Sequence, residues 1–281
     1  MLVTFILIIL TALFSVLFNF LAYNLNGLSL YFLFIWIPLS FILSALLLFL
    51  YVMFMFYVVF PHLKPGNKFV KFTVRSVVIL VNKLARMHIK VEGYENIPNE
   101  TFVVYANHKS MLDVTILYQA LNRPLSGIAK KEVEQMPFLK QFCKCLYVQY
   151  VDRENDMAAV KSMLKAIKYV KGGLNYFIFP EGGVKTRETE TMVALRPGAY
   201  KLATKPEATI LPVSIIGSSK LTTNSFKKRT NIKVIIHKPI SAIEYKNKFI
   251  DESISKEVNT KKLGEYVENI INEGIINESK N

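Results

Sequence analysis

Residues 101–113 read Thr-Phe-Val-Val-Tyr-Ala-Asn-His-Lys-Ser-Met-Leu-Asp, and they set the architecture expected for the body of the chain. Most of residues 101–106 are β-branched or aromatic, which is typical of a buried strand. Residues 110–121 continue with the spacing of an amphipathic helix. A strand that leads through a short polar loop into a helix is the repeating unit of an α/β domain.

The same alternation of strands and helices continues through the rest of the body. Further strands are predicted at residues 125–129, 146–151, 175–179, 209–216 and 231–237. Helices are predicted at residues 137–145 and 157–170, and an amphipathic helix at residues 256–276 ends the series. The pattern predicts an α/β fold with a mixed, largely parallel sheet, in one domain that spans residues 91–281.

The first 63 residues contain no Asp, Glu, Lys or Arg. Residues 1–22 and 29–60 are both apolar and long enough for a spanning helix, which needs about 20 residues. Residues 23–28 between them contain Asn24, Asn26 and Gly27 and indicate a turn. Residues 1–63 are therefore predicted to form a membrane-anchoring helical hairpin. The alternative is that part of this segment lies in the interface without spanning.

Residues 64–90 form a basic flank to this hairpin. Valines and a leucine recur there at helical spacing, which predicts an amphipathic helix over residues 67–87. Its basic face suits an anionic lipid surface, although a helix packed on the domain has the same pattern. Because basic residues stay on the cytoplasmic side, we expect the body on the cytoplasmic face of the cell membrane. The basic residues are Lys64, Lys68, Lys71, Arg75, Lys83, Arg86 and Lys90.

The charge of the chain limits the classes of partner. The net charge is +14, and residues 64–243 hold 29 basic and 13 acidic side chains. Such a body favours anionic lipid or a phosphorylated substrate over nucleic acid, for which no motif is present. Cys143 and Cys145 are too few for a disulfide framework or a zinc cage, and no ligand cluster predicts a metal.

Polar clusters follow three of the predicted strands. Asn107 and His108 follow the first strand, Asp152 and Arg153 the third, and residues 180–182 (Pro-Glu-Gly) the fourth. Ligand sites of α/β sheets lie beyond the carboxyl ends of the strands, so one shared cleft is expected.

His108 is the candidate general base in this cleft. Asp113, five residues on, can orient the imidazole if His108 precedes the helix. The same spacing also arises by chance in proteins without such chemistry. The sequence contains no G-x-S-x-G elbow, P-loop or G-x-G-x-x-G. A base without a protein nucleophile points to direct attack by a hydroxyl of the substrate.

Four blocks carry a resemblance to a known family. They are Asn107-His108-x4-Asp113, Tyr150-Val151-Asp152-Arg153, Phe179-Pro180-Glu181-Gly182 and Leu211-Pro212-Val213. In this order and spacing the chain resembles the 1-acylglycerol-3-phosphate O-acyltransferase family of glycerolipid acyltransferases, over roughly residues 90–220. The first and third blocks are the most specific of the four.

The resemblance implies an activity and a set of site residues. His108, oriented by Asp113, would be the general base for the free hydroxyl of lysophosphatidate. That hydroxyl would attack an acyl thioester directly and give phosphatidic acid, a step of phospholipid biosynthesis. Arg153, with Asn107 and the loop of Glu181 and Gly182, would bind the substrate head group. No cofactor is implied beyond the acyl donor, either acyl-CoA or acyl carrier protein, the latter then also a protein partner.

The third block departs from the family pattern. Gly183 and Val184 stand where the family usually has Thr-Arg. Lys185 or Arg187 is predicted to supply the missing cation, with a solvated loop charge as the alternative. The acceptor could then be another lyso-lipid. A catalytically silent, lipid-binding membrane tether is the other reading of the chain, disfavoured by the presence of both His108 and Asp113.

Overall fold

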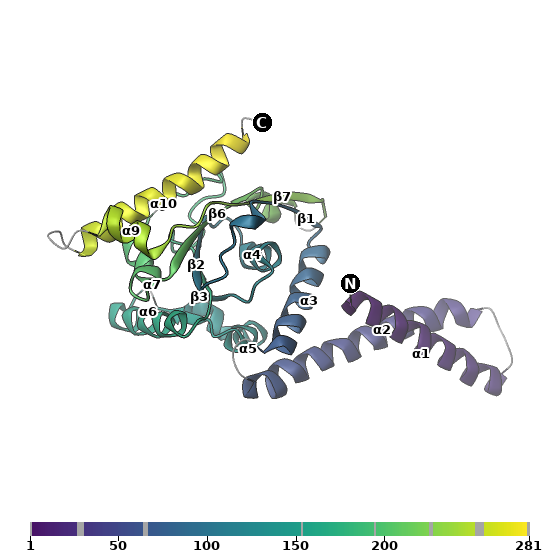
Figure 1. Ribbon diagram of the computed structural model, residues 1–281. Coiled ribbons are helices and arrows are strands. Elements are labelled where there is room, and N and C mark those ends of the chain that lie inside the picture. Colours follow the sequence, from purple (N-terminus) through teal and green to yellow (C-terminus); the bar gives the residue numbers. More distant parts are fainter. Residues whose placement is uncertain are drawn as a thin grey trace.

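The computed structural model describes residues 2–26, 31–63, 67–152, 154–193, 195–224, 227–250 and 256–279. A seven-stranded sheet carries helices on both faces, and a pair of apolar helices extends away from this body (Figure 1). The strands are β1 (Met87–Glu92), β2 (Phe102–Ala106), β3 (Ser126–Lys130), β4 (Gln149–Val151), β5 (Tyr176–Ile178), β6 (Thr209–Ile216) and β7 (Thr230–Ile236). The helices of the body are α3 (Lys68–Leu84), α4 (Asp113–Leu121), α5 (Pro137–Cys145), α6 (Asp156–Lys171), α7 (Lys201–Thr204), α8 (Lys220–Asn224), α9 (Ala242–Phe249) and α10 (Lys256–Ser279).

The sheet has the order β1-β7-β6-β2-β5-β3-β4. Neighbouring strands run parallel except for the antiparallel pair β6–β7. The predicted mixed, largely parallel sheet is therefore confirmed. Because β2 lies between β6 and β5, the loop after β2 leaves the middle of the carboxyl edge. This edge is where ligands bind in open α/β sheets.

The central strand β2 is buried on both faces, and its alternate residues enter two separate cores. Phe102 and Val104 pack with α3 and α4, whereas Val103 and Tyr105 pack with α6, α7 and α10. The hydroxyl of Tyr105 donates to the carbonyl of Ala199 at 3.1 Å, which holds the turn before α7 against the sheet. The central position of the loop after β2 is thus fixed from both sides.

One strand is shorter than the sequence predicts. A strand is expected over residues 146–151, but β4 begins only at Gln149. The amides of Tyr147 and Val148 bond back to the carbonyls of Lys144 and Cys143 and close the end of α5. Tyr147 accordingly has a left-handed φ of 59°. An apolar run can end a helix before it enters a strand, and periodicity alone does not separate the two uses.

Helix α3 packs its apolar stripe on the body. Val70, Val74 and Val78 are buried in the core that also contains β2. Of the two alternatives for this amphipathic segment, a lipid-bound helix or a helix packed on the domain, this arrangement corresponds to the packed helix. Contact of its basic face with lipid stays a prediction, as does the division of the chain at residues 63 and 90.

Helices α1 (Leu2–Asn26) and α2 (Tyr31–Phe54) lie side by side and form the expected hairpin (Figure 1). A π-helical turn, η1 (Met55–Val59), and a 3₁₀ turn, η2 (Phe60–His62), continue α2 into the body. Within the described residues, Phe34–His62 is long and apolar enough to cross a membrane, whereas the apolar stretch Phe5–Leu21 is shorter. Their many exposed apolar side chains indicate membrane association.

A histidine joins β6, β7 and α10. Ser214 of β6 donates its hydroxyl hydrogen to the carbonyl of Ile271 in α10, so it accepts from Nε2 of His237 at 2.7 Å. The ring also lies against Gly274, where an added Cβ would come within 2.5 Å of Cε1. Burial lowers the pKa of His237 from 6.5 to about 4. The folded protein therefore holds this imidazole neutral.

This burial predicts a pH dependence of stability. Because the folded pKa is depressed, the unfolded chain takes up the proton first, and stability is lost as the pH falls from about 6.5 to about 4. We expect the melting temperature of the wild type to fall relative to that of His237→Gln over this range, since glutamine can donate to Ser214 without titrating. The exposed His88→Gln variant is the control, and its melting temperature should follow that of the wild type. If the melting temperature of His237→Gln also followed that of the wild type over this pH range, the assignment would be contradicted.

Candidate active site

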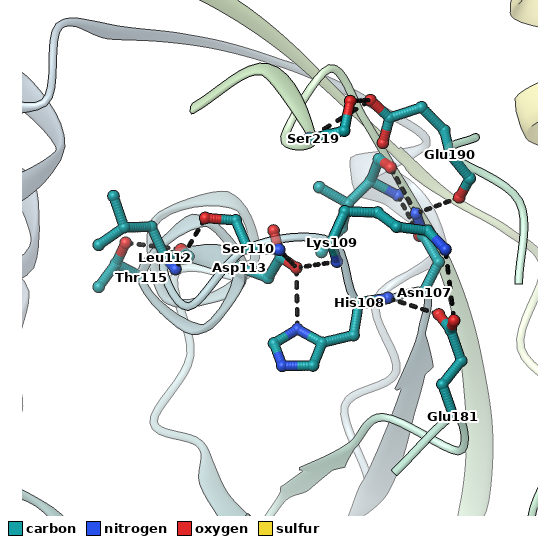
Figure 2. A network of polar contacts seen from close by, with 11 residues as sticks. Asn107, His108, Lys109, Ser110, Leu112, Asp113, Thr115, Glu181, Glu190 and Ser219 are labelled. Carbon is teal, nitrogen blue, oxygen red and sulfur yellow. Dashed lines mark hydrogen bonds and ion pairs between the residues drawn. The ribbon is translucent and has the colours of Figure 1, made fainter. Parts of the chain in front are cut away.

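The loop that follows β2 brings His108 and Asp113 together. Nδ1 of His108 lies 2.9 Å from Oδ2 of Asp113 (Figure 2). The Asp113 side chain is fully buried, whereas that of His108 is 16% exposed. A carboxylate at Nδ1 places the proton on that nitrogen, so Nε2 carries the lone pair. In Figure 2 this second nitrogen points away from Asp113.

The same carboxylate oxygen organises the turn into the helix. Oδ2 of Asp113 accepts hydrogen bonds from the backbone amides of Lys109 at 2.7 Å and Ser110 at 2.8 Å. These bonds wrap residues 108–110 around the carboxylate, and α4 begins at Asp113, not at residue 110 as the periodicity predicts. An acidic side chain in the first turn also interacts favourably with the helix dipole.

Aromatic packing fixes the plane of the imidazole. The ring of His108 stacks on Phe179, with centroids 4.1 Å apart and planes 8° apart. Phe179 in turn packs against Phe177 of β5, at 5.6 Å between centroids. The tip of the Phe177 ring lies against Gly127 of β3, where an added Cβ would come within 2.2 Å of Cζ. Three neighbouring strands therefore determine where the imidazole lies.

Glu181 binds the His108 loop from the neighbouring strand. Its Oε1 accepts from the backbone amide of His108 at 2.8 Å, and its Oε2 lies 3.3 Å from Nζ of Lys109 (Figure 2). Glu181 and Lys109 are both fully buried. The sequence predicts Glu181 as a substrate-binding residue, but in the structure it positions the loop. Sequence reasoning missed Lys109, because a lysine beside a histidine looks like an ordinary surface charge.

Asn107 has a structural task as well. Its Nδ2 donates to the carbonyls of Glu190 and Ile215, and its Oδ1 accepts from the amide of Ile215 at 2.8 Å. The side chain is fully buried. The structure therefore shows a structural role for Asn107, and its contact with a substrate stays a prediction. The carboxylate of Glu190 binds the next turn through Gly217 and Ser219, which extends the network in Figure 2.

The loop after β5 contacts Arg196, to which the sequence analysis assigns no role. Gly182 has a φ of +73°, and an added Cβ would lie 2.5 Å from Nε of Arg196. The backbone amide of Arg196 donates to the carbonyl of Pro180 at 3.1 Å. Arg196 is exposed, as are Lys185 and Arg187 further along the loop. Gly182 therefore leaves room for a guanidinium beside the residue that holds His108.

The predicted cluster of Asp152 and Arg153 follows β4, which is an edge strand of the sheet. Asp152 contacts Nζ of Lys131 at 2.7 Å, and this ion pair lowers the pKa of the carboxyl. Arg153 lies outside the described residues, so its assignment to the head group stays a prediction. No group of three His, Cys, Asp or Glu side chains that could hold a metal occurs in the described part of the chain.

Together these contacts give His108 the geometry expected of a general base. His108 can accept a proton at Nε2, and Asp113 can stabilise the resulting imidazolium. The geometry suits deprotonation of a substrate hydroxyl at the carboxyl edge of the sheet.

Comparison with known proteins gives related chains. The family model described as Acyltransferase matches residues 88–216. The 1-acyl-sn-glycerol-3-phosphate acyltransferase of Saccharomyces cerevisiae is 27% identical over 201 residues, which cover 70% of this chain and 62% of that protein. The chain thus spans less than two thirds of the length of this relative. The enzyme of the same name from Bacillus subtilis is 30% identical over 177 residues, which cover 62% of this chain and 84% of that protein.

A solved structure has the same fold. The 1-acyl-sn-glycerophosphate acyltransferase PlsC from Thermotoga maritima superposes with a TM-score of 0.64 at 22% identity, covering 82% of this chain and 88% of that chain. Residues 88–216, which the family model matches, contain β2, the His108 loop and the Glu181 loop. This chain belongs to the 1-acyl-sn-glycerol-3-phosphate acyltransferase family.

Proposed function

We propose that this protein transfers a fatty acyl group from a thioester to the free hydroxyl of 1-acylglycerol-3-phosphate and so makes phosphatidic acid for phospholipid biosynthesis. The observation that carries the proposal is the 2.9 Å contact of His108 Nδ1 with a buried Asp113, which leaves Nε2 directed away from that acid. The names of the related proteins supply the acceptor. The donor is acyl-CoA or acyl carrier protein.

The chemistry requires one base and no covalent enzyme intermediate. Nε2 of His108 takes the hydroxyl proton as the oxygen attacks the thioester carbonyl, and Asp113 stabilises the imidazolium. The tetrahedral intermediate then collapses, the carbon–sulfur bond breaks, and the imidazolium returns its proton to the departing thiolate. Phe179 keeps the imidazole plane constant during both transfers.

Basic side chains of the Glu181 loop bind the phosphate of the acceptor in this proposal. A phosphate dianion is well matched to a planar guanidinium. The family usually has an arginine at the position of Val184. Arg196 lies against Gly182 and supplies the guanidinium in its place. Arg153, Lys185 and Arg187 remain candidates for further contacts. The membrane hairpin delivers the lipid substrate, with the active site on the cytoplasmic side of the cell membrane.

A different lyso-lipid acceptor is the second candidate function. The observation that favours it is the pair Gly183-Val184, which lacks the polar and basic side chains usual at this point. Product analysis by mass spectrometry separates the two candidates. Membranes containing the protein are supplied with lysophosphatidate or a neutral lysophospholipid, and with acyl-CoA or acyl-carrier protein as donor. Phosphatidic acid should form; acylation of the neutral acceptor alone would replace this proposal with the second.

Removal of the base should abolish most of the activity. We expect His108→Ala to lower kcat by about 10²–10⁴, the usual contribution of a positioned general base. Steady-state acyl transfer with the purified protein measures this, with the exposed His88→Ala as the matched control. Full activity of His108→Ala, at an unchanged melting temperature, would eliminate the mechanism.

The role of Arg196 can be measured separately from the chemistry. A hydrogen bond to a charged group contributes about 1.5–3 kcal/mol, so Arg196→Gln should raise KM for lysophosphatidate roughly 10- to 100-fold. The KM for a neutral acceptor should stay constant, and Val184→Arg should restore part of the loss. A remote Arg229→Gln variant is the control. An equal rise for both acceptors would assign Arg196 to loop structure instead.

A further inference from the structure

A cavity lies at the opposite edge of the sheet from His108. It has a volume of about 290 Å³ and opens between α3, the end of α4 and the segments that lead into β3 and β5. Leu125 precedes β3 and Asn175 precedes β5, so these lining residues stand at the amino ends of parallel strands. His108 follows the carboxyl end of β2, which runs parallel to β5. The cavity is therefore separate from the active site.

The rim of the cavity is cationic. Lys71 and Arg75 project from adjacent turns of α3, and Arg123 comes from the segment after α4. None of the lining residues, all of which are described, is acidic. Asn67 at the start of α3 also lines the cavity, and a helix N-terminus adds partial positive charge there. An anionic group is the ligand that this rim would attract.

The interior of the cavity is mostly apolar. Val70, Val74 and Leu125 are buried in its wall. Tyr118 and Ser126 also line the cavity, and the hydroxyls of both already donate to backbone carbonyls. A cationic rim above an apolar interior fits an amphiphile. Its volume equals that of roughly ten water molecules, which leaves room for more than a phosphate group.

The cavity adjoins the point where the membrane hairpin meets the body. Cys145 lines it, and its Sγ lies 3.7 Å from the carbonyl of Phe56 in η1. Gln141 of α5 donates to the same carbonyl at 2.7 Å. Phe72, another lining residue, and Phe69 are 49% and 43% exposed at this end of α3. Figure 1 shows the start of α3 and α5 beside the end of α2. A lipid of the surrounding bilayer can therefore reach the cavity.

We propose that this cavity binds one anionic phospholipid. The lipid bound there is a structural ligand and takes no part in the acyl transfer. Lys71, Arg75 and Arg123 hold the phosphate, and the glycerol with the first part of an acyl chain enters between α3 and β3. The bound lipid joins α3 to the segment before β3, and so fixes the body on its membrane hairpin. This site is independent of the acyl transfer proposed at His108.

Lipid binding to the full chain in neutral detergent tests this proposal. The melting temperature and the apparent Kd are measured with phosphatidylglycerol, with phosphatidylcholine and with inorganic phosphate. The test variant is Lys71→Gln/Arg123→Gln, which leaves the contact between Arg75 and Asn122 in place. The control variant, Lys83→Gln/Arg229→Gln, also removes one lysine and one arginine, both exposed and outside the cavity.

Phosphatidylglycerol should stabilise the wild type more than phosphatidylcholine does. The cavity variant should bind it roughly 30-fold more weakly, as expected when two basic side chains near an anionic head group are lost. The control variant should bind like the wild type. Equal losses in both variants would show diffuse surface charge and overturn the proposal. Equal stabilisation by inorganic phosphate would also overturn it.

Discussion

The carboxylate of Glu181 is the constraint on which the site depends. It lies after β5, yet it accepts the amide of His108 after β2 and faces the ammonium of Lys109 in a fully buried setting. A buried ion pair contributes little net stability, because desolvation offsets most of the attraction. Removing one side chain of the pair nevertheless destabilises the fold, because the other charge is then buried without a partner. The arrangement therefore serves mainly to fix position: it joins two adjacent loops at the carboxyl edge of the sheet.

Two further contacts complete the orientation of the imidazole, and each constrains a different motion. The bond to Asp113 fixes rotation within the ring plane, because only one ring nitrogen can meet Oδ2. The stack on Phe179 fixes the plane itself. That stack depends on Phe177 and on the absence of a side chain at Gly127, two strands from His108. The imidazole is thus held by contacts from β2, β3 and β5, and such positioning is what the proposed role as general base requires.

The sequence predicts the elements of this fold well, because each depends on local periodicity. The strand after residue 101 and the helix over residues 137–145 occur within one residue of expectation. Motif spacing also indicates His108 and Asp113. What it could not supply are facts that depend on contacts between distant segments: the burial of Lys109, the internal bonding of Asn107, and the approach of Arg196 to Gly182. Arg196 lies fourteen residues beyond that glycine, and no linear pattern shows that the loop returns. The predicted start of β4 was wrong for a different reason. The turn that ends α5 at Tyr147 consists of apolar residues, which look like the beginning of a strand.

The internal pairing of the acids has an electrostatic consequence for substrate entry. Asp113 Oδ2 receives three donors, and Glu181 receives an amide and an ammonium, all from residues 108–110. Both carboxylates are therefore compensated within the loop before any ligand arrives. Among its described residues, the adjoining loop exposes three basic side chains, Lys185, Arg187 and Arg196, against one acidic side chain, Glu188. An approaching phosphate consequently meets a net positive charge on the adjoining loop. The negative charge of Asp113, which orients the imidazole, is already compensated by its three hydrogen-bond donors. A site of this kind can keep an anionic orienting group beside its imidazole and still attract an anionic substrate, because the carboxylates are paired with donors of residues 108–110 while the exposed cations stand on the adjoining loop.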